Sequence, residues 1–62
     1  MQRFLYRVQY TLPDGVVTYE PVCVRAVDET DAHTQVMDAT ARYGDIVGAI
    51  RVLTLLLVTA DA

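Results

Sequence analysis

Apolar and polar residues alternate over the first twelve positions of the chain. From Phe4 to Leu12, every second side chain is apolar and the side chains between them are mostly polar. Such alternation is typical of a β-strand with one buried face. Pro13-Asp14-Gly15 follows, which favours a tight turn because proline fixes φ and glycine accepts positive φ. We therefore predict a β-hairpin whose first strand buries Phe4, Tyr6, Val8, Tyr10 and Leu12.

The turn also suggests a register for this hairpin. If Leu12 pairs with Val17 across the turn, Tyr10 faces Tyr19 on the second strand. Aromatic pairs directly across two antiparallel strands are favourable. We therefore expect this pair of tyrosines to help fix the hairpin.

The second strand is expected from about Val16 to Val27, with Pro21 in its middle. Proline has no N–H for the ladder, so it belongs on an edge strand or at a bulge. A bulge at Pro21 would shift the alternation by one residue. The positions that would then share a face with Phe4 and Tyr6 are Val22, Val24 and Ala26.

A helix is predicted after the second strand. Asp28 is a suitable N-cap, and Glu29 and Asp31 place negative charge in the first turn. Gly44 is expected to end the helix at the C′ position. A narrow apolar stripe recurs at the helical period and consists of Ala32, Val36, Ala39 or Thr40, and Tyr43.

The segment from Ile46 to Ala60 is rich in Val, Ile and Leu and predicts a third strand, with a bend near Gly48. Both of its faces are apolar, which is typical of a strand covered on both sides. We expect the face toward the helix to carry Ile50, Val52, Leu56 and Val58. The other face would carry Leu53, Leu55 and Leu57.

These elements predict one α+β domain over residues 1–62 with the order ββαβ. Because Pro21 requires an edge, the three-stranded sheet is expected in the order 2-1-3, a split βαβ unit with one helix packed on one face. The crossover through the helix should be right-handed and should make the second and third strands parallel.

One face of such a sheet has no helix to cover it. With the expected alternation, this open face carries Leu5, Arg7, Gln9, Cys23, Arg25, Val27, Arg51, Leu53, Leu55 and Leu57. The third strand is also an edge, and it has no Lys or Pro to deter association. We therefore expect a homodimer, formed edge to edge or face to face, or else a different protein partner. The expected interaction residues are Leu5, Leu53, Leu55, Leu57, Arg7, Arg25 and Arg51.

Composition strengthens the case for association. A chain of 62 residues with 53% hydrophobic residues buries only part of its apolar surface in one small core. Cys23 is the only cysteine and His33 the only histidine, which excludes an intrachain disulfide and a zinc cluster. Oligomerisation remains as the source of added stability. The sequence shows no export signal and no apolar stretch of membrane-spanning length, so we expect a cytoplasmic protein that does not bind membranes.

Candidate chemistry is sparse. His33 has no nucleophile or orienting acid that recognisably converges on it, and Cys23 is interpreted as a small apolar residue on a sheet face. Isolated glycines give no phosphate-binding loop. We therefore expect no catalytic site, no cofactor and no metal. Carboxylates in the helical segment are interpreted as caps and a solvated surface, which also offers an acidic docking face for a basic partner: Glu29, Asp31 and Asp38.

An arginine patch provides an alternative. Arg7, Arg25 and Arg51 on one sheet face would suit a regulator that binds nucleic acid. However, the net charge is −3, and the aromatics of the first strand are expected on the helix side. Both features argue against nucleic acid as the partner.

The residues from Val24 to Ala32, followed by Gly44, Val47, Ile50, Val52 and Leu53, resemble a recurrent ββαβ pattern. In that pattern a strand ends in "A-x-D-E-x-x-A", a helix follows, and a "G-x-x-V-x-x-I" strand returns. Similar chains occur among small phage and bacterial accessory proteins. The resemblance implies the fold, and it implies a protein that binds and occludes a host protein as an inhibitor or regulator.

Overall fold

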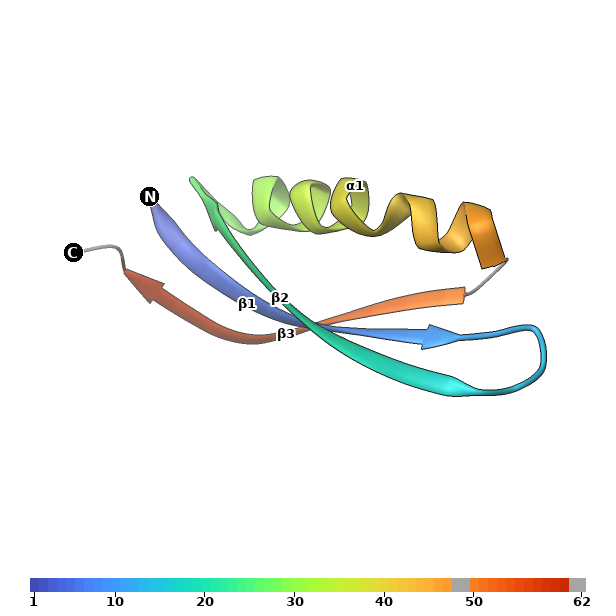
Figure 1. Ribbon diagram of the computed structural model, residues 1–62. Helices are drawn as coiled ribbons and strands as arrows, with labels where there is room; N and C mark the ends of the chain where they lie inside the picture. The colour runs from blue at the N-terminus through green and yellow to red at the C-terminus, as the bar shows by residue number, and fades with distance from the viewer. Residues whose placement is uncertain (48–49, 61–62) are drawn as a thin grey trace.

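The chain folds as a three-stranded sheet with one helix on one face (Figure 1). The computed structural model describes residues 1–47 and 50–60, with the side chains of residues 1–41 and 50–60. The sheet order is β2-β1-β3, and β1 is antiparallel to both neighbours. The predicted α+β fold and strand order are thus confirmed. The elements are β1 (Gln2–Thr11), β2 (Val17–Ala26), α1 (Glu29–Val47) and β3 (Ile50–Ala60).

The hairpin between β1 and β2 closes one residue tighter than predicted. The Leu12 N–H donates to the Val16 carbonyl at 2.8 Å, and the Gly15 N–H donates to the Leu12 carbonyl at 2.9 Å. Gly15 has a φ of 90°, as the last residue of a three-residue hairpin loop commonly does. The Asp14 carboxylate accepts from the Val16 N–H at 3.0 Å and holds the turn.

This tighter loop changes the cross-strand pairs. Tyr10 lies opposite Thr18, and Tyr19 lies opposite Gln9. The predicted Tyr10–Tyr19 pair is therefore wrong, and Tyr19 faces away from the helix. The hydroxyl of Tyr10 instead donates to the Glu20 carboxylate at 2.8 Å.

The bulge predicted at Pro21 is also wrong. The register between β1 and β2 runs without a shift, and Pro21 lies opposite Arg7. As an edge strand, β2 tolerates the missing N–H of proline without a bulge. The one-residue error at the turn and the extra residue at the supposed bulge add up to two residues, which is one full period of a strand and leaves each side chain on the same face. The positions predicted to share a face with Phe4 and Tyr6 are therefore placed correctly: Val22, Val24 and Ala26.

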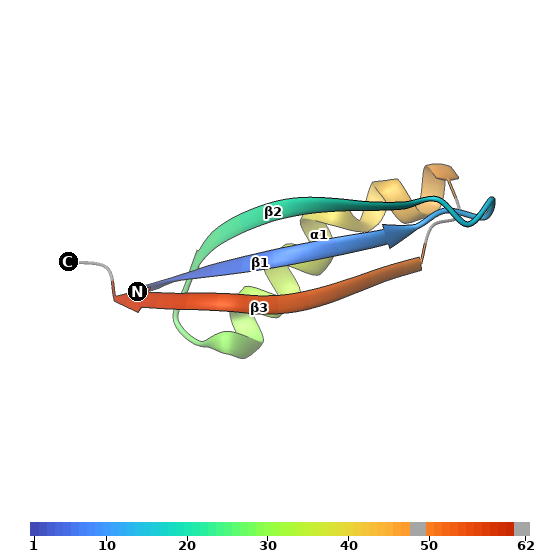
Figure 2. The same ribbon diagram turned by 90° about the horizontal axis from the view of Figure 1, so that it is seen from below.

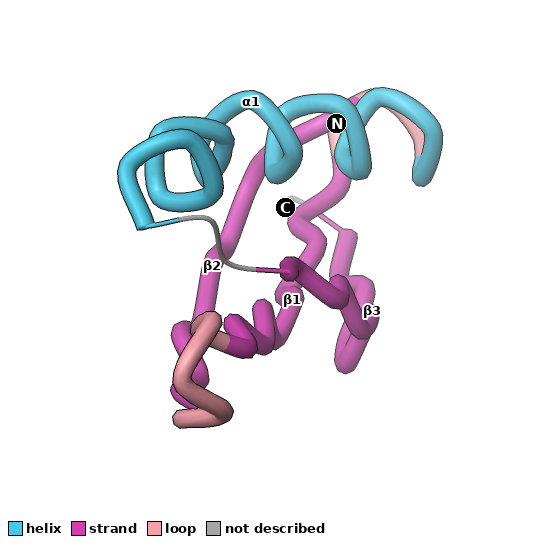
Figure 3. Tube along the Cα trace, turned by 90° about the vertical axis from the view of Figure 1, so that its right-hand side faces the viewer, coloured by secondary structure: helices cyan, strands magenta, loops and turns pink. Residues whose placement is uncertain are grey.

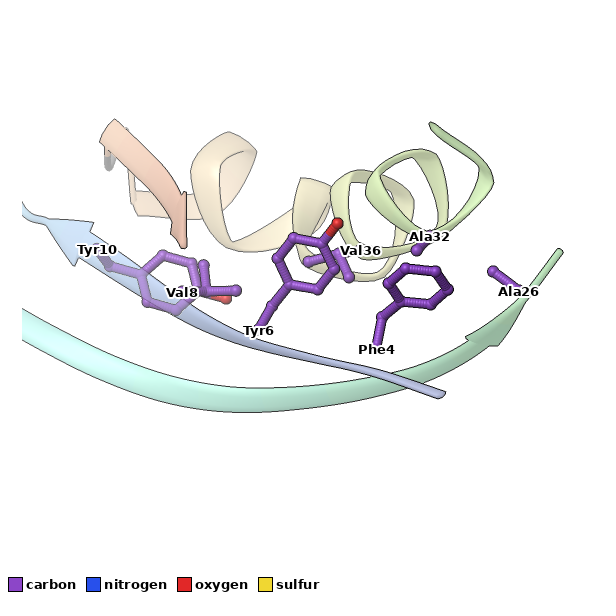
Figure 4. Packing of buried hydrophobic residues seen from close by; sticks show 7 residues of the cluster. All are labelled: Phe4, Tyr6, Val8, Tyr10, Ala26, Ala32 and Val36. Carbon is purple, nitrogen blue, oxygen red and sulfur yellow. The ribbon is translucent and has the colours of Figure 1, made fainter. Parts of the chain in front are cut away.

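The core lies between β1 and the first half of α1 (Figure 4). Side chains of β1 alternate as predicted from Phe4 to Tyr10, but Leu12 lies beyond the strand and is only half-buried. The small residues Ala32 and Val36 of α1 allow the helix to approach the rings of β1. Thr40 is buried at the next helical position, whereas Ala39 is exposed. The buried apolar residues are Phe4, Tyr6, Val8, Tyr10, Ala26, Ala32 and Val36.

The helix begins as predicted and ends later than predicted. Asp28 accepts from the Asp31 N–H at 2.8 Å, and Asp31 reaches back to the Val27 N–H at 3.3 Å. At the other end, α1 continues through Gly44 to Val47. The ten-residue strands extend about 33 Å, and a helix ending before Gly44 would reach about 6 Å less far along them. The helix therefore continues past Gly44, because the longer helix carries the chain further along the sheet toward the start of β3.

Over the first half of β3, each side chain lies on the face of the sheet opposite to the one we expected. Arg51, Leu53 and Leu55 pair with Tyr10, Val8 and Tyr6, so they lie on the helix side of the sheet. A register shift between Leu5 and Tyr6 skips Leu56 and returns Leu57 to the open face. The expected open-face positions of Arg51, Leu53 and Leu55 are wrong, and that of Leu57 is correct. Of the residues expected on the helix side, Ile50 and Val52 lie opposite Thr11 and Gln9 on the open face, while Val58 faces the helix side as expected.

Candidate interaction surfaces

The outer edge of β3 combines an unpaired strand edge with exposed apolar side chains. Only β1 pairs with β3 in the described sheet, so the outward-facing backbone groups of β3 have no strand beside them. From Val52 to Ala60 the strand contains no charged residue and no proline. Such an edge is a template for another strand. Its exposed large apolar side chains are Ile50, Val52, Leu56, Leu57 and Val58.

The opposite edge, on β2, is less suited to pairing. Pro21 in its centre has no N–H to offer a further strand. Glu20 and Arg25 add charge of both signs along the same strand. The two edges of the sheet therefore differ, and β3 is the one that lacks protection.

The helix covers the three strands unequally. It crosses its face of the sheet obliquely (Figure 2) and packs mainly against β2 and β1. Seen along the sheet (Figure 3), no described element lies on the opposite face. Leu53 and Leu55 pack against the core but remain partly exposed. As a result, β3 has apolar surface on both of its faces.

Arg51 connects β3 to the helix. Its guanidinium donates to the Met37 carbonyl at 2.9 Å and to the Thr40 hydroxyl at 2.8 Å. The Thr40 hydroxyl in turn donates to the Val36 carbonyl at 2.8 Å. These bonds explain why Arg51 lies on the helix side, because there its charged group finds acceptors beside the core. Arg51 is therefore not part of an open-face arginine patch.

The open face retains Leu5, Arg7, Arg25 and Leu57 from the predicted interaction residues. Leu5 is half-buried and lies between Cys23 on β2 and Leu57 on β3. Arg7 and Arg25 are exposed, on β1 and β2 respectively. The structure thus brings two of the three predicted arginines together on this face.

Sequence reasoning missed Tyr19 as an open-face residue. The guanidinium carbon of Arg7 lies 5.3 Å from the centre of the Tyr19 ring, and Tyr19 is 59% exposed. A cation over an aromatic face at this distance is attracted by the ring quadrupole. A three-residue hairpin loop at Pro13-Asp14-Gly15 was the signal that could have placed Tyr19 correctly.

The acidic residues predicted as a docking face lie on different sides of α1. Successive helical residues are about 100° apart, so Asp31 and Asp38 share one side and Glu29 lies on the other. Asp31 is half-buried and accepts from the Val27 N–H and from the Gln35 amide. Glu29 and Asp38 are exposed.

The hydroxyl of Tyr6 is a buried polar group without a hydrogen-bond partner among the described residues. Its ring lies against the helix beside Val36 (Figure 4). Burial raises the pKa of Tyr6 above its ordinary value of 10.0, and the negative charge of Glu29 raises it further. Both effects favour the neutral phenol.

Cys23 and His33 lie far apart in the fold. Cys23 is a free, exposed thiol on the open face, whereas His33 is exposed on α1. Glu29, Thr30, His33 and Thr34 line a shallow depression of about 350 Å³ on the helix surface. Among the described residues, no group of three His, Cys, Asp or Glu side chains is placed to hold a metal ion.

Comparisons with protein-family models, with curated proteins and with solved structures give no match for this chain. None of the helices in the described part of the chain is long and apolar enough to cross a membrane. The β3 edge and the open face of the sheet are the two surfaces that remain to be explained.

Proposed function

We propose that this chain is a small protein-binding module that acts through the edge of β3, and that its partner there is a second copy of the chain. The observation that supports this proposal is the combination found on β3: an unpaired strand edge with apolar side chains exposed on both faces. A long apolar edge of this kind favours pairing with another strand. Burying it also supplies the stability that a domain of 62 residues needs.

Antiparallel pairing of β3 with β3 of a second copy fits the symmetry of most dimers. A two-fold axis between the two β3 strands, beside their midpoints, makes every contact occur twice, once in each direction. The result is one continuous sheet of six strands, with both helices on the same side. Exposed residues at one end of β3, such as Ile50 and Val52, then lie beside Leu57 and its neighbours in the other copy.

Face-to-face dimerisation through the open sheet faces is the weaker arrangement. It would bury Arg7 and Arg25 of both copies, and none of the described side chains on that face is a carboxylate. Taking a charged side chain out of water costs several kcal/mol. Edge pairing leaves these arginines in water.

In the cell, the module is proposed to act as an inhibitor or regulator that occludes a cognate or host protein. Its role as a non-enzymatic binder accords with its resemblance to small phage and bacterial accessory proteins. Binding of nucleic acid by an arginine patch is the alternative. The case for it is weaker because Arg51 bonds to α1 on the helix side and is therefore missing from the patch.

Solution mass measured by light scattering over a dilution series tests the dimer. We expect twice the mass of the chain at high concentration and a shift to the single chain on dilution. Leu57→Lys places a charge on the β3 edge and should give a monomer with an unchanged circular dichroism spectrum. Val17→Lys is the matched control, because Val17 is exposed on β2 at the other edge, and this variant should remain a dimer.

The proposal is overturned if the wild type is monomeric at every concentration. It is also overturned if Leu57→Lys and Val17→Lys change the mass equally. Amide hydrogen exchange provides a second measurement. In the dimer, the amides of β3 should be protected along both edges of the strand, and in the Leu57→Lys variant half of them should exchange quickly.

A further inference from the structure

The charges of this protein are separated between the two sides of its sheet. On the open face the described charged residues are all arginines: Arg3, Arg7 and Arg25. The described carboxylates lie elsewhere, at the hairpin loop, at the helix-side position of Glu20, and along the helical segment from Asp28 to Asp38. The open face is therefore positive although the whole chain has a net charge of −3.

Arg7 and Tyr19 form the centre of this face. Arg7 lies opposite Pro21 on β2 and leans over the ring of Tyr19, 5.3 Å away. The ring limits the freedom of the long arginine side chain and leaves its donors in solvent. Arginine and tyrosine are the residue types enriched at the centres of protein interfaces.

Apolar side chains surround this pair. Val17 and Pro21 are exposed on β2, and Val52 and Leu57 are exposed on β3. A fitting ligand therefore combines carboxylates with apolar side chains. An extended segment in which acidic and apolar residues stand two positions apart meets both requirements, because residues i and i+2 of a strand point to the same face.

We propose that the open face of the sheet docks an acidic, partly apolar segment of a protein partner, with Arg7 and Tyr19 as the main contacts. This site borders the β3 edge and shares Val52 and Leu57 with it, but its main contacts lie on β1 and β2, and it does not require a second copy of the chain. A nucleic acid is a poorer fit. Tyr19 is the only aromatic side chain on the described part of this face, and the net negative charge of the chain repels a polyphosphate.

Fluorescence anisotropy at low salt tests this site with a short labelled peptide in which Glu and Leu alternate at every second position and Thr stands between them. We expect binding that Arg7→Gln weakens about tenfold and that Tyr19→Leu also weakens. Thr34→Glu is the matched control, because it changes the net charge by the same amount at an exposed position on α1. That variant should bind the peptide as the wild type does. All the substituted residues are exposed, so circular dichroism should show folded variants.

Three results would overturn the proposal. One is no binding of the Glu-Leu peptide, or binding that Arg7→Gln leaves unchanged. Another is tighter binding of a labelled oligodeoxythymidine than of the peptide, which would assign the face to nucleic acid. The third is peptide binding that Leu57→Lys abolishes and Arg7→Gln leaves unchanged, which would place the peptide on the β3 edge. None of these results bears on whether the wild type dimerises.

Discussion

Arg51 on β3 donates a 2.8 Å hydrogen bond to the hydroxyl of Thr40 on α1. Thr40 is only 2% exposed, so this bond lies at the boundary between the core and the third strand. It joins the crossover helix α1 to the strand that follows it in the chain. Among the side-chain hydrogen bonds of the described residues, those of Arg51 are the polar links between α1 and β3.

Replacement of Thr40 by valine should therefore destabilise the fold. Thr40→Val keeps the shape of the side chain and leaves the Arg51 guanidinium with one acceptor fewer, at a cost of about 1–2 kcal/mol in the free energy of unfolding. Thr34→Val is the matched control. Thr34 makes the same kind of bond to the carbonyl four residues earlier, at 3.1 Å, but is exposed. Urea denaturation should show a change within about 0.5 kcal/mol for the control, and an equal loss in both variants would contradict the role of Arg51.

The two buried tyrosines of β1 should respond differently to loss of the hydroxyl. Tyr6→Phe removes a group that has no partner, so the free energy of unfolding at neutral pH should stay the same or rise. Tyr10→Phe removes the bond to Glu20 and should cost about 0.5–1.5 kcal/mol. Chemical denaturation of both variants checks this order, and a larger loss for Tyr6→Phe would reveal a partner for its hydroxyl.

Tyr6 should also make the protein sensitive to alkali. Its pKa in the folded state is raised above 10.0, so the unfolded chain loses this proton at lower pH than the folded chain does. The stability that it contributes is complete below pH 10 and is lost as the pH rises through the folded pKa. Denaturation midpoints measured at neutral pH and above pH 10 should therefore differ more for the wild type than for Tyr6→Phe. Parallel curves would show that Tyr6 does not ionise.

The hairpin turn should tolerate little change at Gly15. Its φ of 90° is strained for a residue with a Cβ, although a Cβ there would meet no atom within 4 Å. Gly15→Ala should therefore cost about 1 kcal/mol through backbone strain alone. Gly15→Asn should cost less, because asparagine accepts positive φ more readily. Thermal unfolding of both variants tests this, and equal stability of Gly15→Ala and wild type would contradict it.

The helix start provides a test of the Asp28 cap. Asp28→Ala removes the bond to the Asp31 N–H and should lower the free energy of unfolding by about 1 kcal/mol. Asp38→Ala makes the same charge change at an exposed position in the middle of α1 and should have a smaller effect. Urea denaturation of the two variants compares cap and charge directly. Equal losses would mean that charge, rather than the cap, sets the effect.

The sequence predicted the order of the elements and the burial of β1 because alternation and capping are local signals. The same signals could not predict which side chains of β3 face the helix, because both of its faces are apolar and show no alternation. The partners of Arg51 decide its orientation, and they lie on the helix, 11 and 14 residues earlier in the chain. The shift at Leu56 then reverses the phase within the strand. The open face was consequently predicted with Arg51, Leu53 and Leu55, and without Tyr19.

The central position of β1 has a consequence for how the protein forms during synthesis. Its two neighbours are made at different times, since β2 follows directly and β3 only after the whole of α1. A two-stranded hairpin is at best marginally stable in water. While β3 is still being made, β1 therefore has one bare edge, and the Arg51 link to the helix does not yet exist. The domain should become protease-resistant in a single late step, when its third strand emerges from the ribosome.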